Sequence, residues 1–307
     1  MKIKTKNEYS QLRSIIVGSV KKFSWPINDT NFDKSVASST FEHTFKKKTL
    51  PDNIIKETEN DLDSLANVLE KENVNVYRPQ IDKPNWSYSA RDILLTVGSR
   101  MIECPTKYKS RANETEFYEH VKKSSLEWNC EWIQAPSPIK DDDPMFDAAN
   151  VLKFDDKLLY LVSSTGNEAG AEWLQQQVGT EFEVIVWKDV YAFAHIDSTI
   201  ASLNENTILI NASRVSYKSL PLFLRQHRKI WINDIVARDF YQFPYASKWI
   251  GLNILSIDPE TVIVDRIQTK LIERLKDTGF RVIELELRHS RTLGGGFHCV
   301  TLDLERE

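Results

Sequence analysis

Residues 149–163 read ANVLKFDDKLLYLVS, and this stretch, with the segments that follow it, decides the fold. Two apolar segments flank an Asp-Asp pair, a pattern typical of a β-hairpin with a short turn. The apolar residues of 167–178 recur at helical spacing and predict an amphipathic helix. The segment EVIVW at 183–187 is predicted to form a third strand. The unit is therefore strand, strand, helix, strand.

The same unit recurs on both sides of this stretch. Predicted hairpins follow at 199–210 (TIASLNENTILI) and 253–264 (NILSIDPETVIV), and another precedes it at 92–104 (DILLTVGSRMIEC). A less regular first copy begins with SIIVG at 14–18. Each copy continues into a predicted helix and a last strand. The predicted helices lie near 54–72, 114–126, 218–226 and 269–278, the last of them stopping at Gly279 as a C-terminal cap.

Five such copies predict an α/β fold of the propeller type. A repeat of about 50 residues is near the upper end of the periods that indicate a propeller or a solenoid. We therefore expect a five-bladed ββαβ propeller with pseudo-fivefold symmetry, forming a single domain over residues 1–307. The alternative is an α+β protein with hairpins in series. The positions of the polar residues favour the ring, as described below.

The composition excludes several classes of protein. The 307 residues are 41% hydrophobic and 27% charged, which is typical of a globular protein. The 40 basic and 44 acidic residues give a net charge of −4, so no basic field for nucleic acid is expected. No apolar run approaches the roughly 20 residues of a membrane span. Motifs for nucleotide or metal binding are missing, and we expect neither cofactor nor metal.

The cysteines indicate a reducing compartment. Cys104, Cys130 and Cys299 are an odd number without a CxxC pair, which argues against a disulfide framework. The N-terminal MKIKTKNEYS has no apolar stretch after its lysines, so we predict a cytoplasmic protein. Cys104 and Cys130 lie within predicted apolar strands and are interpreted as buried structural residues.

A set of polar residues recurs with the same period as the modules. These residues are Asp92, Asp147, Asp197, Ser247 and Cys299. They recur at intervals of about 50 to 55 residues, near the start of each later module and after the last one. Equivalent positions in a ring meet near one end of its axis. The ring therefore predicts one pocket with three carboxylates, a hydroxyl and a thiol.

The chemistry of this set points to a planar cation as substrate. Cys299 follows three glycines, which let the backbone approach a ligand closely, and His195 forms a His-x-Asp motif with Asp197. A histidine oriented by a carboxylate can move protons for a thiolate nucleophile. Three carboxylates would oppose thiolate formation unless the ligand is itself positive. A guanidinium fits, because carboxylates accept its paired N–H groups in plane.

The motifs resemble those of the arginine:glycine amidinotransferases, a family of the pentein superfamily. The carrying segments, spread over nearly the whole chain, are Ala90-Arg91-Asp92 followed by ILLTVG, MIECP and KSR; Pro144 to Ala149; His195 to Thr199; Ala246 to Trp249 with LN at 252–253; and Leu293 to Cys299. The resemblance implies the five-bladed ββαβ fold already expected, and often a homodimer.

The resemblance also implies roles for individual residues. Cys299 would be the nucleophile, His195 the general acid and base, and Asp147 its orienting partner. Asp92 and Asp197 would grip the guanidinium. Arg214 would hold the α-carboxylate of the donor, and Ser247 would line the amino-acid pocket. The implied reaction is ping-pong: arginine gives its amidino group to Cys299, ornithine leaves, and an amine acceptor takes the group.

Three positions depart from the glycine enzyme. Ala192 and Ala194 stand where that enzyme has Asn and Met, and Ala246 stands where it has the first serine of a Ser-Ser pair. Smaller side chains widen a pocket, so we expect an acceptor amine larger than glycine, as in natural-product pathways.

Two other functions remain open at this point. A hydrolase of the same fold, such as an arginine deiminase or a dimethylarginine hydrolase, would form the same covalent intermediate. A binding protein that has kept the fold without catalysis is the third alternative. His298 is predicted not to be the base, because neighbouring strand residues point to opposite faces.

Overall fold

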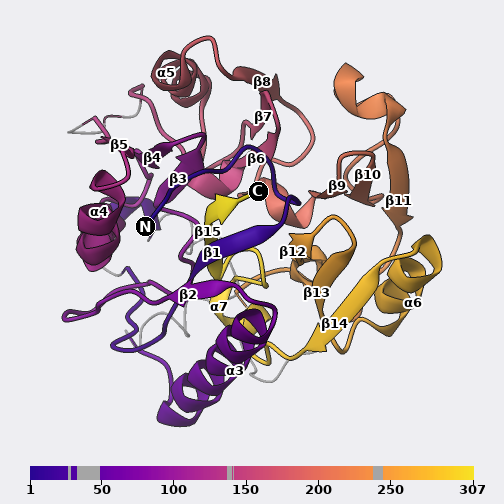
Figure 1. Cartoon of the computed structure of the whole chain (residues 1–307), viewed down its shortest axis with the longest axis horizontal. Coiled ribbons are helices and arrows are strands. Elements are labelled where there is room, and N and C mark those ends of the chain that lie inside the picture. Colours follow the sequence, from indigo (N-terminus) through magenta and orange to yellow (C-terminus); the bar gives the residue numbers. More distant parts are fainter. Residues whose placement is uncertain (27–28, 33–48, 137–139, 141, 238–244) are drawn as a thin grey trace.

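The described chain forms a ring of five small three-stranded sheets (Figure 1). The computed structural model describes residues 1–26, 29–32, 49–136, 140, 142–237 and 245–307. In each sheet the first two strands are antiparallel and the last two are parallel, as a ββαβ unit requires. The predicted α/β propeller is therefore confirmed.

The blade formed by residues 149–187 has the predicted elements. It consists of β6 (Val151–Phe154), β7 (Lys157–Leu161), α5 (Glu168–Val178) and β8 (Glu183–Trp187). The side chain of Asn167 accepts a hydrogen bond from the Gly170 N–H and so caps the start of α5. The remaining blades contain β3 (Leu94–Val97), β4 (Arg100–Glu103), η1 (Lys109–Tyr118), α4 (Glu119–Leu126) and β5 (Glu131–Ile133); β9 (Ile200–Asn204), β10 (Thr207–Asn211), η4 (Leu222–Gln226) and β11 (Arg228–Ile232); and β12 (Leu255–Asp258), β13 (Thr261–Asp265), α6 (Thr269–Thr278) and β14 (Arg281–Leu285).

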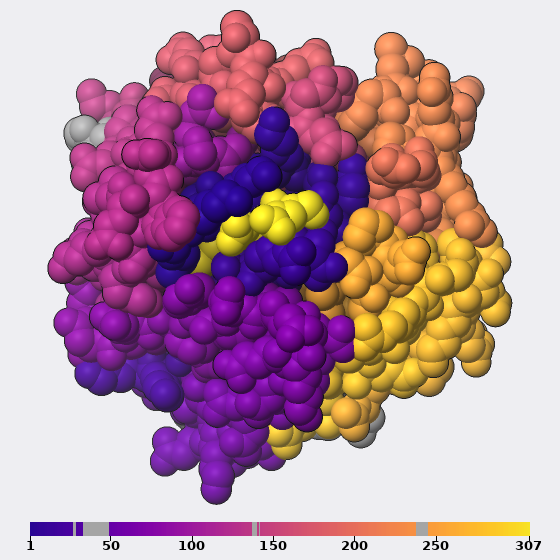
Figure 2. Space-filling view, in the orientation of Figure 1, coloured from indigo at the N-terminus to yellow at the C-terminus, as the bar shows by residue number. Residues whose placement is uncertain are grey.

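The two ends of the chain close the ring. The first blade contains β1 (Leu12–Val17), α3 (Asp52–Lys71) and β2 (Asn75–Tyr77), and its missing strand is the C-terminal β15 (Thr301–Arg306). β15 pairs antiparallel with β1. In Figure 2 the yellow C-terminal segment lies between indigo N-terminal segments in the middle of the face. This pairing joins the last module to the first.

Burial follows the order of the strands in a blade. All four residues of β3 and of β6 are buried, whereas the outer strands β2, β5 and β14 are only partly covered. The inner strands therefore line the axis, and the helices cover the outside. Among the described residues, no helix is long and apolar enough to cross a membrane.

Two local predictions are corrected by the structure. The helix expected at 218–226 is only the short 3₁₀ segment η4, because Pro221 precedes it and disfavours an α-helix through the residues before it. The helix expected near 114–126 begins as the 3₁₀ segment η1 and becomes α-helical only in α4. The end of α6 at Gly279 is confirmed, with a left-handed φ of 105° at that glycine.

Candidate active site

The periodic polar residues meet at one end of the axis, as predicted. Asp92 precedes β3, and Asp147 precedes the 3₁₀ turn η2 (Ala148–Asn150) that leads into β6. Asp197 lies in η3 (Ile196–Ser198) before β9, and Ser247 directly precedes η5 (Lys248–Leu252) before β12. Cys299 stands two residues before β15. Each inner strand thus delivers one of these side chains to the same opening.

All five, together with His195, line a cavity of about 360 Å³. Its walls carry aromatic rings from Trp86, Tyr108, Tyr191, Phe193 and Tyr245. Such a cavity, apolar at its sides and polar at its floor, is typical of a site for a small molecule.

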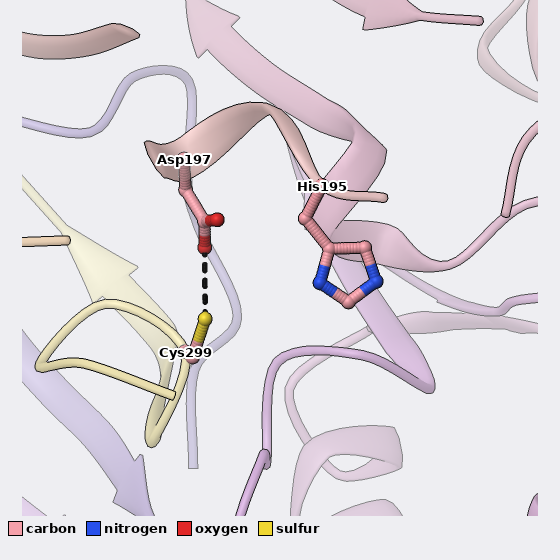
Figure 3. Close-up of side chains that lie close together, drawn as sticks. All are labelled: His195, Asp197 and Cys299. Atoms are coloured by element: carbon pink, nitrogen blue, oxygen red, sulfur yellow. Dashed lines mark hydrogen bonds between the residues drawn. The ribbon is translucent and has the colours of Figure 1, made fainter. Parts of the chain in front are cut away.

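The thiol of Cys299 lies at the floor of this cavity. The side chain is 2% exposed, and its Sγ donates a hydrogen bond to Asp197 Oδ2 at 3.2 Å (Figure 3). Asn253 holds the residue from the other side, since its Nδ2 donates to Sγ at 3.2 Å and its Oδ1 accepts from the Cys299 N–H at 2.9 Å. The nucleophile predicted from sequence is therefore fixed in one orientation.

The three glycines before Cys299 make this arrangement possible. Gly294 ends the short helix α7 (Ser290–Leu293) with a φ of 81°, and a Cβ there would lie 2.4 Å from a ring carbon of Tyr245. A Cβ on Gly296 would lie 2.6 Å from Cβ of Asn253. Side chains at these positions would push away the aromatic wall and the asparagine that holds the thiol.

His195 faces the thiol across the floor. Ligand atoms of His195, Asp197 and Cys299 all lie within 4.8 Å of one another, and Figure 3 shows the ring beside the sulfur. Its Nε2 lies 3.0 Å from Asp147 Oδ2, and its Nδ1 lies 3.8 Å from Asp92 Oδ1. Burial by itself would lower the pKa of His195, but Asp92, Asp147 and Asp197 raise it to about 9. The ring is therefore an imidazolium at neutral pH.

The carboxylates leave acceptor atoms unused. Asp92 Oδ2 accepts from Arg111 at 2.6 Å, and burial raises the pKa of Asp92. Within the described part of the chain, the buried atoms Asp92 Oδ1 and Asp147 Oδ1 have no hydrogen-bond partner. Buried polar atoms are nearly always paired in native proteins, so these oxygens suit a ligand that brings N–H donors.

The same residues could also offer ligands to a metal ion. His195, Asp197 and Cys299 present three ligand atoms close together. Metal binding would release the proton of the ring and the proton of the thiol, since a metal-bound histidine is neutral and a metal-bound cysteine is a thiolate.

The other predicted residues are placed as follows. Ala194, Ala246 and Ser247 line the cavity, but Ala192 and Arg214 do not. Ala192 is exposed, so its small side chain does not widen this cavity.

The guanidinium of Arg214 stacks on Tyr191 at 3.5 Å and donates to Ser198 and Thr199. Tyr191, which lines the cavity, therefore covers Arg214.

Two residues close to the reacting groups were missed. Asn253 and Arg111 lie in the segments LN and KSR that carried the resemblance, but nothing in the repeat assigned them a task. The reason given for excluding His298 is wrong, because residues 297–300 form a turn and not a strand. His298 nevertheless lies outside the cavity lining and contacts Asp197 instead.

The charge around Cys299 predicts a slowly reacting thiol. Burial, then Asp197 and Asp92, raise the pKa of Cys299 well above its ordinary value of 9.0. The thiolate fraction is therefore small at pH 7. We expect alkylation by the neutral reagent 2-chloroacetamide to accelerate about tenfold per pH unit up to and beyond pH 9.

An Asp197→Asn variant provides the comparison for this measurement. It removes the carboxylate nearest the sulfur, so it is expected to raise the alkylation rate at pH 7 by about tenfold. Cys104 and Cys130 are buried and are monitored by peptide mass analysis. A rate that levels off below pH 8 in the wild-type protein would contradict the electrostatic account.

Known proteins share both the sequence and this fold. No family model matches the chain. It is 38% identical to inosamine-phosphate amidinotransferase 1 of Streptomyces griseus, over 98% of this chain and 96% of that protein. The chain belongs to the amidinotransferase family. The predicted resemblance is confirmed, and this amidinotransferase is an enzyme that transfers amidino groups.

Two further comparisons agree. The L-arginine:L-lysine amidinotransferase of Pseudomonas savastanoi pv. phaseolicola is 30% identical over 97% of this chain and 93% of its own length. The solved inosamine-phosphate amidinotransferase of Streptomyces griseus superimposes on this amidinotransferase with a TM-score of 0.88 and 36% identity, covering 99% and 97% of the two chains. A solved DDAH of Pseudomonas aeruginosa matches with a TM-score of 0.69 and 17% identity, covering 95% and 99%, which shows a shared pentein fold alone.

Proposed function

We propose that this enzyme takes the amidino group of L-arginine onto Cys299, releases L-ornithine, and passes the group to an amine larger than glycine. The observation that carries the proposal is the cluster of sulfur, imidazole and carboxylate at the floor of the cavity, with two further carboxylate oxygens lacking partners. A guanidinium brings a flat positive charge and several N–H donors, which is the complement of this floor.

The first half of the reaction follows from the charges. A guanidinium between Asp92 and Asp197 cancels the negative field that keeps Cys299 protonated, so its arrival favours the thiolate. The proton of the thiol leaves to solvent, because His195 is already protonated. The thiolate attacks the guanidino carbon and forms an S–C bond. The imidazolium of His195, held by Asp147, protonates the departing amine as its C–N bond breaks. Ornithine leaves, and an amidino-cysteine remains.

The second half reverses these roles. The acceptor amine enters the space that ornithine leaves, and the now neutral His195 takes a proton from it. The amine attacks the amidino carbon, and the thiolate of Cys299 is released. Asn253 donates to the sulfur and stabilises the thiolate that forms.

The far end of the donor requires a cation at the wall of the cavity. Arg214 can hold the α-carboxylate only if Tyr191 leaves its stack with the guanidinium. Lys107 lines the cavity and has no ion pair with any described residue, so it is a second candidate for this contact. The aromatic walls would pack against the aliphatic stem of arginine in either case.

The acceptor is expected to be bulkier than glycine. Ala194 and Ala246 leave room at the cavity wall, and the relatives named above act, by their names, on inosamine phosphate and on lysine. An aminocyclitol phosphate or a long amino acid is therefore the class we propose. A place in a natural-product pathway and a cytoplasmic location belong to the same proposal.

A product assay tests the proposal. The enzyme is incubated with L-arginine labelled at the guanidino carbon, together with glycine, lysine or an aminocyclitol phosphate. Ornithine and a labelled guanidino derivative of one of the larger amines are the expected products. Labelled citrulline as the main product with every amine would support the hydrolase alternative instead.

A further inference from the structure

A cluster of buried polar residues lies behind Asp197, on the side away from the cavity. His298 Nδ1 donates a hydrogen bond to Asp197 Oδ2 at 2.9 Å, and this is the same oxygen that accepts from Cys299. The other ring nitrogen, Nε2, lies 3.5 Å from Glu8 Oε2, too far for a good hydrogen bond. His298 thus connects an active-site carboxylate to a second carboxylate that no step of the reaction uses.

Glu8 is a buried anion with several cations around it. It is 5% exposed, and its Oε1 lies 3.1 Å from Lys153 Nζ. Arg91 Nη1 lies 3.5 Å from its Oε2, and the same guanidinium pairs with Asp303 at 2.8 Å. Burial by itself would raise the pKa of Glu8, but Lys153, His298 and Arg91 lower it to about 2. Glu8 is therefore a fixed negative charge beneath the active site.

A small cavity lies beside His298 and Glu8. Its volume is about 10 Å³, and its polar lining comes from Glu8, Asp197, Ser202, Ser256 and His298. Three buried atoms among these residues, Glu8 Oε2, Ser202 Oγ and His298 Nε2, have no hydrogen-bond partner in the described chain. A space of about 10 to 15 Å³ with two to four polar neighbours is what a buried water molecule requires.

We propose that this cavity holds one water molecule, and that His298, the water and Glu8 together keep the Asp197 carboxylate ionised and directed at Cys299. The water would donate to His298 Nε2 and Glu8 Oε2 and accept from the hydroxyl of Ser202. With both nitrogens engaged, the ring cannot turn away from Asp197. His298 and Glu8 are then positioning residues that act through Asp197, and neither touches the substrate.

The first test is a crystal structure of the full-length protein. An ordered water within hydrogen-bond distance of Ser202 Oγ, Glu8 Oε2 and His298 Nε2 is expected. A cavity without density at a resolution that shows the other buried waters would overturn the water-mediated link.

The second test measures how strongly the site prefers a cation. Cys299 is alkylated at pH 7 by 2-chloroacetamidine, which is positively charged, and by neutral 2-chloroacetamide. Both reagents form an S–C bond with loss of chloride. The rate with the cationic reagent divided by the rate with the neutral one therefore measures how strongly an ionised Asp197, directed at Cys299, attracts the cation. A His298→Leu variant is expected to lower this ratio by at least about 10-fold, because it removes a hydrogen bond to a charged group.

A conservative variant and a matched control separate positioning from stability. The side-chain amide of His298→Asn can replace Nδ1 as donor but not the contact of Nε2 with the water, so its ratio should lie between the ratios of His298→Leu and the wild type. His289 is equally buried, meets Glu57 at 2.7 Å and does not line the active-site cavity. His289→Leu should leave the ratio unchanged.

The outcomes are distinct. An unchanged ratio in His298→Leu, or an equal fall in His289→Leu, would overturn the positioning role. If His298→Leu does not fold, a ratio for His298→Asn equal to that of the wild type would overturn it as well. A wild-type protein that shows no preference for the cation would instead contradict the proposed guanidinium site, while the water would still be tested by the crystal structure.

Discussion

A Cys299→Ala variant will release ornithine from arginine at least about 10⁴-fold more slowly than the wild-type enzyme. The thiol at the cavity floor is held by the amide of Asn253 and the carboxylate of Asp197 together. The hydroxyl groups that also line the cavity, such as those of Ser164 and Ser198, contact no neutral base that could activate them. Without the sulfur, the amidino group has no carrier between donor and acceptor.

Mass analysis checks the covalent step directly. Wild-type protein incubated with arginine alone should gain about 42 Da on the peptide that contains Cys299, the mass of one amidino group replacing a proton. Cys130→Ala is the matched control, because Cys130 is a buried thiol that does not line the cavity. It should keep both the adduct and the activity. Ornithine release by Cys299→Ala within tenfold of wild type would contradict the covalent mechanism.

The repeat and the chemistry of the site could be predicted because they depend on local patterns. Alternating apolar segments, turn residues and a helix in each copy specify a blade. One polar residue before each inner strand is then brought to the axis by the symmetry of the ring. Asp92, Asp147 and Asp197 needed only this spacing to be placed in one cavity with Cys299.

Features that depend on distant or individual contacts could not be predicted in this way. The pairing of β15 with β1 joins residues at opposite ends of the chain, and no local pattern specifies it. Asn253 follows the 3₁₀ segment η5 of another blade, and its side chain donates to Cys299 Sγ. It does not belong to the set of polar residues that recur with the module period. The stack of Tyr191 on Arg214 depends on side-chain packing in a loop. As a result Arg214 lies behind Tyr191 and does not line the cavity, contrary to expectation.

The buried charges at the axis are a further case. A single lysine or glutamate is normally expected on the surface, yet Lys153 and Glu8 are almost completely buried. They are tolerated because opposite charges compensate one another in the network with Arg91 and Asp303. Since Glu8 comes from the N-terminal segment and Asp303 from β15, this network assembles only when the ring closes.

A His195→Gln variant will release ornithine about 10³-fold more slowly, because the departing amine then lacks its proton donor. His195 is an imidazolium at neutral pH, with a pKa raised to about 9 chiefly by Asp92 and Asp147 against the opposing effect of burial. Its acid form is fully present well below pH 9 and is lost as the pH rises through that value. At saturating arginine, where the bound guanidinium has favoured the thiolate, ornithine release by the wild-type enzyme should therefore fall as the pH rises through the pKa of His195.

Rapid-quench measurement of ornithine between pH 6 and pH 10, with arginine and no acceptor, isolates this step. The His195→Gln variant should lack the fall near pH 9, since it has no imidazolium to lose. His120→Gln is the control, because His120 lies in α4, does not line the cavity, and should keep the wild-type profile. The same alkaline fall in His195→Gln would assign the titration to another group. Another residue would then have to be the general acid of the first half-reaction. Asp92 would be the next candidate, because burial raises the pKa of its carboxyl group.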